Sequence, residues 1–215
     1  MRACSKEDFL EDIKNHTMTI LMDSSEYRHV VFSNNGSAVY KFSLITWPGY
    51  LCITGDMGCY VFSRLRDMFE FFRADRGSNL ERSINPAYWA EKLQAAVRDG
   101  VFTFNHTDCR AEVLRYTRNW LREHYYQTTK QERRWLMEEI RDEVLIDIDD
   151  GSSRDVAMTS IYQFTSKVNT RLNFQFTDFF GRNFDDFSYP FIWCCYAIAW
   201  GINTYDETKQ YRTVV

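Results

Sequence analysis

A turn-like segment at residues 54–58 combines glycines and an acidic side chain in a pattern that suits ligand binding. Gly55 and Gly58 bracket Asp56 and Met57 between two short β-like runs. Glycine lets a ligand approach the backbone, and the carboxylate can orient a partner or a cation. The alternative is a hairpin turn in which both glycines take positive φ and Asp56 bonds the backbone. The segment matches neither a Walker loop nor a dinucleotide-binding fingerprint.

A basic face is predicted on a helix that spans residues 107–126. Arg115, Arg118 and Arg122 follow i, i+3, i+7 spacing, which places them on one side of the helix. Arginine forks bind phosphates or acidic protein patches, and the interleaved tyrosines offer stacking surfaces. The alternative is a solvated face on which the arginines pair with glutamates of the same helix.

Acidic residues gather at positions 142, 143, 147, 149 and 150. If the segment 146–149 is extended, Asp147 and Asp149 share a face and can hold a hard cation. The calcium-loop pattern, with its glycine and closing glutamate, is missing. A solvated edge or loop is therefore the alternative, and we assign no metal ligand here.

Motifs of covalent catalysis and of metal binding are not found in the sequence. There is no Gly-x-Ser-x-Gly elbow, and the histidines at positions 16, 29, 106 and 124 lack the spacing of a metallohydrolase. The six cysteines, at positions 4, 52, 59, 109, 194 and 195, include no Cys-x-x-Cys pair. We predict that they are small buried apolar residues rather than a structural zinc site. No catalytic residue, metal or cofactor is assigned, and a binding protein is favoured over an enzyme.

Composition indicates a folded protein with more aromatic residues than its core needs. The 215 residues are 45% hydrophobic and 17% aromatic, so we expect some aromatic side chains at a binding surface. Trp47 is the aromatic residue that we assign to binding. The net charge of −4 provides no global field toward nucleic acid or an anionic membrane. No signal peptide or membrane span is recognisable, so a cytoplasmic protein is expected.

The first third of the chain predicts an antiparallel β-meander. Ser5 can cap a helix that extends to about residue 15, and Asn34-Asn35-Gly36 suits a hairpin turn. Strand-like runs follow the helix at residues 18–22, 27–33, 38–46, 51–53 and 60–62. These runs predict a meander of five strands.

The remainder of the chain is predicted to be largely helical. Helices are expected after Ser63, over residues 85–98, 107–126, 129–143 and 152–168, and from Pro190 to Ile202, with one further strand at 171–177. No Gly/Ser-rich linker divides the chain. We therefore predict a single α+β domain, β-rich over about 1–75 and helical over about 76–215.

One segment resembles a family of uncharacterised bacteriophage and prophage proteins. The resemblance is carried by Trp-Pro-Gly-Tyr-Leu-Cys-Ile-Thr-Gly-Asp-Met-Gly from Trp47 to Gly58, by Tyr-Val-Phe at 60–62 and by Asp-Met-Phe-Glu-Phe-Phe at 67–72. It covers about residues 38–73. The family carries no assigned enzyme activity, so the resemblance implies a phage origin and no catalytic residues.

This origin leads to an expectation about function. Phage proteins without a catalytic signature are often binders that disable a host system, so we expect a protein that antagonises a bacterial host or anti-phage defence system by protein–protein interaction. The expected partner is a bacterial host protein, with a symmetric dimer as the default state. The alternatives are sequestration of a phosphorylated nucleotide signal and a metal-dependent nucleic-acid enzyme.

Overall fold

The computed structural model describes residues 3–73, 84–97, 100–168, 173–177, 179 and 181–213. Two compact units are present, and the predicted α+β class is confirmed. The sheet unit consists of residues 1–103 and 187–215, and the helical unit consists of residues 104–186. The C-terminal helix thus belongs with the sheet.

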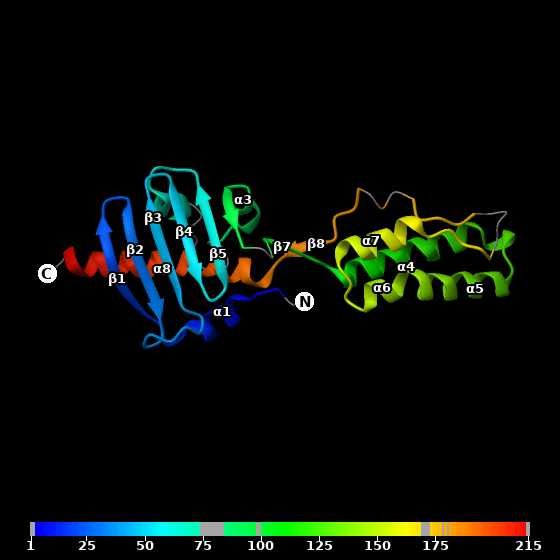
Figure 1. Cartoon of the computed structure of the whole chain (residues 1–215), viewed down its shortest axis with the longest axis horizontal. Helices are drawn as coiled ribbons and strands as arrows, with labels where there is room; N and C mark the ends of the chain where they lie inside the picture. Colours follow the sequence, from blue (N-terminus) through cyan, green and yellow to red (C-terminus); the bar gives the residue numbers. More distant parts are fainter. Residues whose placement is uncertain are drawn as a thin grey trace. The chain divides into compact units, whose positions relative to one another are not determined.

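The sheet unit contains six antiparallel strands whose spatial order follows the sequence (Figure 1). They are β1 (Thr17–Ser24), β2 (Tyr27–Ser33), β3 (Phe42–Trp47), β4 (Tyr50–Gly55), β5 (Gly58–Ser63) and β6 (Leu93–Ala96). The five predicted strands are confirmed, although the third begins at Phe42 rather than at residue 38. The sixth strand was not predicted.

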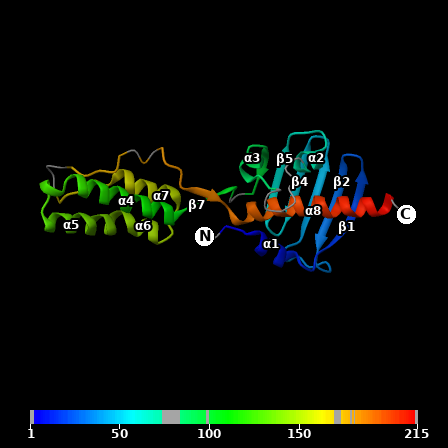
Figure 2. The ribbon, with the colours of Figure 1, turned by 180° about the vertical axis from the view of Figure 1, so that it is seen from behind.

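Helices cover one face of this sheet. They are α1 (Lys6–Ile13), α2 (Met68–Arg73), α3 (Pro86–Ala90) and α8 (Tyr189–Thr213). Ser5 and Asp8 form the capping box of α1. Figure 2 shows α8 running across the sheet, where a Cβ built on Gly201 would lie 2.9 Å from Leu44 and 3.1 Å from Phe32. Glycine therefore allows α8 to approach the strands closely.

The predicted helix over residues 85–98 was wrong beyond Ala90. Asn85 caps α3 and Pro86 begins it as expected, but Leu93–Ala96 forms β6 beside β5. Without β6, β5 would be an edge strand with unpaired backbone N–H and C=O groups. The hydrophobic periodicity of residues 85–98 contains no information about this pairing. The helix expected after Ser63 also begins later, at Met68, because Ser63 is the last residue of β5.

A buried ion pair joins the sheet to the start of α2. Arg28, which is 9% exposed, donates two hydrogen bonds to the Asp67 carboxylate at 2.9 and 2.8 Å. Asp67 also accepts the Phe69 backbone N–H at 2.9 Å. The Arg28 guanidinium lies 4.7 Å from the centroid of the Phe69 ring. One carboxylate thus neutralises the arginine and holds the first turn of α2.

The helical unit contains the helices that were predicted over residues 107–126 and 129–143. Its elements are α4 (His106–Glu123), η2 (Tyr125–Gln127), α5 (Lys130–Ile140), the π-helical turn η3 (Arg141–Leu145), α6 (Ile146–Asp149) and α7 (Arg154–Gln163). Val113 and Ile140 are fully buried between the helices, together with Phe179. Of the strand expected at 171–177, the described residues contribute an isolated bridge between Gln175 and Thr165, and residues 171–172 lie outside them.

Two short strands, β7 (Phe102–Phe104) and β8 (Asp185–Phe187), form a second sheet. The chain passes from one unit to the other within each of them. Among the described helices, none is long and apolar enough to cross a bilayer.

Candidate functional site

The sheet has a second face, which we call the open face. Its side chains point away from α8, because strand neighbours alternate between the two faces. In Figure 1 this face is toward the viewer, and no described helix lies over it. The strand register assigns the following residues to it: Thr17, Thr19, Met22, Ser24, Tyr27, His29, Val31, Ser33, Ser43, Ile45, Trp47, Tyr50, Cys52, Thr54, Cys59, Val61, Ser63 and Ala95.

The open face carries no Asp, Glu, Lys or Arg at any of these positions. Charged residues make up 26% of the chain, so a solvated sheet face of this size would be expected to carry several. Depletion of charge is the compositional signal of the centre of a protein interface. The composition of this face therefore resembles that of a contact surface.

The centre of the open face is an apolar row that crosses the four strands from β3 to β6, and His29 of β2 lies at its end. His29 pairs with Ile45, Ile45 with Cys52, Cys52 with Val61, and Val61 with Ala95. Ile45, Cys52 and Val61 are half-buried, and none of them belongs to the described core on the α8 side. Each of the three keeps part of its surface exposed, so the row is accessible to a partner.

An aromatic pair lies at one end of the open face. Trp47 and Tyr50 flank the β3–β4 turn, and their rings stack with centroids 5.2 Å apart and planes 15° apart. Gly49, with φ of +87°, closes this turn and donates its N–H to the Arg66 carbonyl. Trp47 was predicted as a binding residue, and the structure places it on the uncharged face.

The segment Gly55–Gly58 forms the turn of the next hairpin, between β4 and β5, and serves as a structural turn. A Cβ on Gly55 would lie 2.0 Å from the Lys41 carbonyl oxygen, so the close approach is made by the protein itself. Asp56 accepts the Tyr40 N–H at 2.8 Å and donates its own N–H to Lys41 at 2.9 Å. Gly58 has φ of +112°. These contacts account for both glycines and for Asp56 without a ligand.

The predicted arginine face lies on α4, where its members differ in their contacts. Arg115 donates two hydrogen bonds of 2.6 Å to Glu112, which also pairs with Arg182. Arg118 donates to the Leu114 carbonyl at 3.2 Å. Arg122 is exposed, and no ion pair is found for it among the described residues. Among the described residues, a carboxylate therefore balances the charge of Arg115 alone of the three, and Glu112 shares that carboxylate with Arg182.

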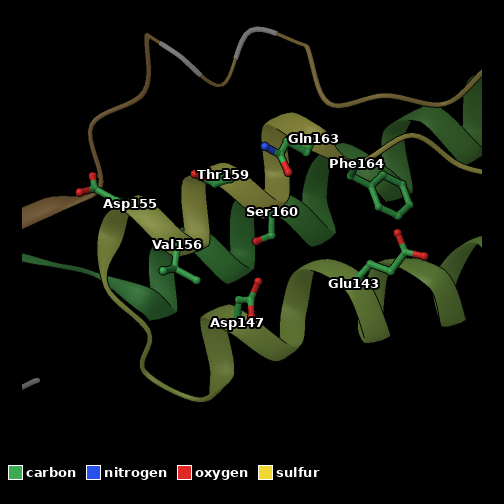
Figure 3. A pocket seen from close by; sticks show the side chains of 8 residues that line it. All are labelled: Glu143, Asp147, Asp155, Val156, Thr159, Ser160, Gln163 and Phe164. Carbon is green, nitrogen blue, oxygen red and sulfur yellow. The ribbon is translucent and has the colours of Figure 1, made fainter.

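The acidic cluster is helical rather than extended. Asp147 and Asp149 lie on α6, and Asp149 binds Arg110 at 2.8 Å. Asp147 instead lines an open depression of about 510 Å³ with Glu143, Asp155 and Ser160 (Figure 3). Among the described residues, no group of three His, Cys, Asp or Glu side chains is placed to hold a metal ion.

A search of protein-family models, curated protein sequences and solved structures finds no match to this chain. Function is therefore inferred from the residues of this chain alone.

The cysteine prediction holds for four of the six residues. Cys4, Cys109, Cys194 and Cys195 are buried, but Cys52 and Cys59 are half-buried on the open face. Their sulfur atoms lie 3.8 Å apart across β4 and β5. The spacing of six intervening residues gives no motif, but the two-residue turn between the strands is the signal that could have predicted this pair.

Proposed function

We propose that this protein acts by binding another protein through the open face of its sheet. The observation that carries the proposal is that six paired strands present no charged side chain on that face. The resemblance to phage proteins supports a bacterial host protein as the partner, namely a component of an anti-phage defence system in the host cytoplasm. Binding would then disable that component.

The size of the open face agrees with this role. Strands about 4.8 Å apart that rise about 3.4 Å per residue give six strands of about six residues a footprint of roughly 500 Å². A standard interface buries about 800 Å² on each partner. The open face therefore supplies the centre of an interface, and neighbouring loops supply the polar rim.

The residues expected to dominate the affinity are the aromatic pair and the apolar row. Tryptophan and tyrosine are enriched among residues that carry most of the binding energy. The stacked Trp47 and Tyr50 are already ordered, so docking on them costs little side-chain entropy. Ile45 lies in the same strand as Trp47 and occupies the middle of the face.

Replacement of Ile45 with Lys is expected to abolish partner binding while the protein stays folded. The lysine places an unpaired charge at the centre of the interface, whereas in the free protein it can reach solvent. Trp47→Ala is expected to weaken binding by about 2 kcal/mol or more, which is roughly 30-fold. Binding is measured with the purified partner, after mass spectrometry has identified a host protein that is retained from a defence-bearing lysate.

The control for this experiment is Tyr126→Ala. Tyr126 is 98% exposed but lies in the helical unit, so its loss should leave the affinity unchanged. Phage plating on a defence-bearing host supplies the biological readout. The wild-type protein is expected to protect the phage from the defence system, and Ile45→Lys is expected to give no protection. If Ile45→Lys binds the same host protein with wild-type affinity, the open face is not the interface.

Two other functions remain predictions with less support. Nucleotide sequestration would use the α4 arginines, of which Arg115 is already neutralised by Glu112. A metal-dependent enzyme would use Asp147 and Asp149, which do not converge on one site. Thermal stabilisation by a nucleotide, or nuclease activity lost in Asp147→Asn, would favour these functions instead.

A further inference from the structure

A pair of thiols lies within the open face. Cys52 is on β4 and Cys59 on β5, in a hairpin where Cys52 pairs with Val61 and Thr54 pairs with Cys59. The two cysteines are therefore diagonal neighbours on one face, with their sulfur atoms 3.8 Å apart. Both side chains are half-buried, so one side of the pair remains accessible.

This separation fits the coordination geometry of a thiophilic metal ion. Zinc binds cysteine sulfur at about 2.3 Å and prefers tetrahedral geometry, in which two sulfur ligands lie about 3.8 Å apart. One ion could therefore bind both sulfur atoms with little movement of either strand. Two free thiols in contact have a similar separation, and a metal titration distinguishes the two cases.

The surroundings of the pair leave half of a tetrahedral site open. Among the described residues, no third histidine, cysteine or carboxylate completes a metal-binding group. Val61 and Thr54, the strand partners of the two cysteines, are uncharged. The outward side of the pair faces away from α8, where an ion can enter and where two further ligands can reach it.

We propose that Cys52 and Cys59 form a two-thiolate half-site for one thiophilic divalent cation of the Zn²⁺ or Cd²⁺ class. In the isolated protein, water completes the coordination sphere. This inference goes beyond the proposed function and does not depend on it, because both cysteines belong to a single hairpin of this protein.

The proton balance of binding is defined. Each thiol loses its proton as a metal–sulfur bond forms, so two protons pass to the buffer, and the hydrated ion releases all of its water ligands except the two that complete the tetrahedron. Burial, together with the neighbouring Cys59, raises the pKa of Cys52 to about 12. Because binding displaces two protons, the affinity is expected to rise as the pH is raised.

The test is a Cd²⁺ titration of the full chain, kept reduced with a non-chelating phosphine and followed by the thiolate-to-metal charge-transfer absorption in the ultraviolet. Saturation at one ion per chain is the expected result. Saturation at one ion per two chains also supports the site, with the dithiol of a second copy as the remaining ligands. Co²⁺ is expected to give the visible absorption of a tetrahedral complex.

Serine variants distinguish this site from the buried cysteines. Cys52→Ser and Cys59→Ser are each expected to lower the affinity at least about 100-fold, since loss of an outer-shell partner alone costs about 10- to 100-fold. Thr54→Ser keeps both sulfur atoms and should bind as the wild type does. Absence of saturable binding, or binding unchanged in both cysteine variants, overturns the proposal. Neither result bears on partner binding, which is measured separately.

Discussion

Replacement of Asp67 with Ala is expected to lower the free energy of unfolding by about 3–5 kcal/mol, a large part of the 5–15 kcal/mol typical of a folded domain. The substitution leaves Arg28 buried and without its carboxylate partner, in a position that is 9% exposed. It also removes the acceptor of the Phe69 N–H at the start of α2. Urea unfolding, fitted to the transition of the sheet unit, measures the effect.

The adjacent residue provides the control for Asp67. Arg66 forms an ion pair with Glu26, but its side chain is 80% exposed, so Arg66→Ala should cost less than about 1 kcal/mol. Both substitutions remove an arginine–carboxylate ion pair, but the pair of Asp67 is buried whereas the Arg66 side chain is exposed. Equal stabilities of Asp67→Ala and Arg66→Ala would show that the buried pair contributes no more than a surface pair.

Replacement of Gly55 with Ala is expected to destabilise the sheet unit by about 3 kcal/mol or more. The new methyl group would lie 2.0 Å from the Lys41 carbonyl oxygen and 2.7 Å from the Phe42 Cα. Both are backbone atoms, which cannot turn aside as a flexible side chain can, so the hairpin or the start of β3 must shift. Thermal and urea unfolding of the variant measure the cost.

Gly36→Ala separates the steric effect at Gly55 from backbone strain. Gly36 has φ of +81° and no atom within 4 Å of an added Cβ, so its replacement should cost only about 1–2 kcal/mol. Gly55→Ala should be clearly less stable than Gly36→Ala. If Gly55→Ala is as stable as the wild type, the close contact with the Lys41 backbone does not explain the glycine. Residues 55–58 would then again be a candidate binding loop.

The sheet could be predicted well because its signals are local. Short β-propensity runs separated by Asn34-Asn35-Gly36 and by Pro48-Gly49 specify hairpins, and hairpins specify antiparallel neighbours. The helices α4 and α5 were predicted for the same reason, and in the structure Thr129 caps the second of them. These elements depend on residues that are close in the sequence.

The elements that were missed depend on distant parts of the chain. Residues 93–96 have helical spacing after α3, yet they pair with β5, which is some thirty residues earlier. Likewise α8 lies after the helical unit in sequence but packs on the sheet. Tertiary pairing overrides local propensity in both places, and local patterns contain no information about it.

The open face left a signal in the sequence that periodicity could have revealed. A sheet with one solvated face should alternate apolar and polar residues, but the strands read Val30-Val31-Phe32, Leu51-Cys52-Ile53 and Tyr60-Val61-Phe62 without alternation. Such runs indicate strands that are apolar on both faces. The sheet face that stays uncovered is determined by where α8 packs. The residue pattern of the strands does not predict that position.

During synthesis on a ribosome, the sheet unit is the last part of the fold to be completed. The inner faces of its strands, with Phe32 and Leu44, emerge early, whereas α8 follows only after the whole helical unit. Because domains fold as they emerge, we expect the inserted unit to fold first while the sheet waits for its covering helix. Translation that stops before residue 189 would leave the inner face of the sheet uncovered by α8, and such nascent chains should aggregate or require a chaperone.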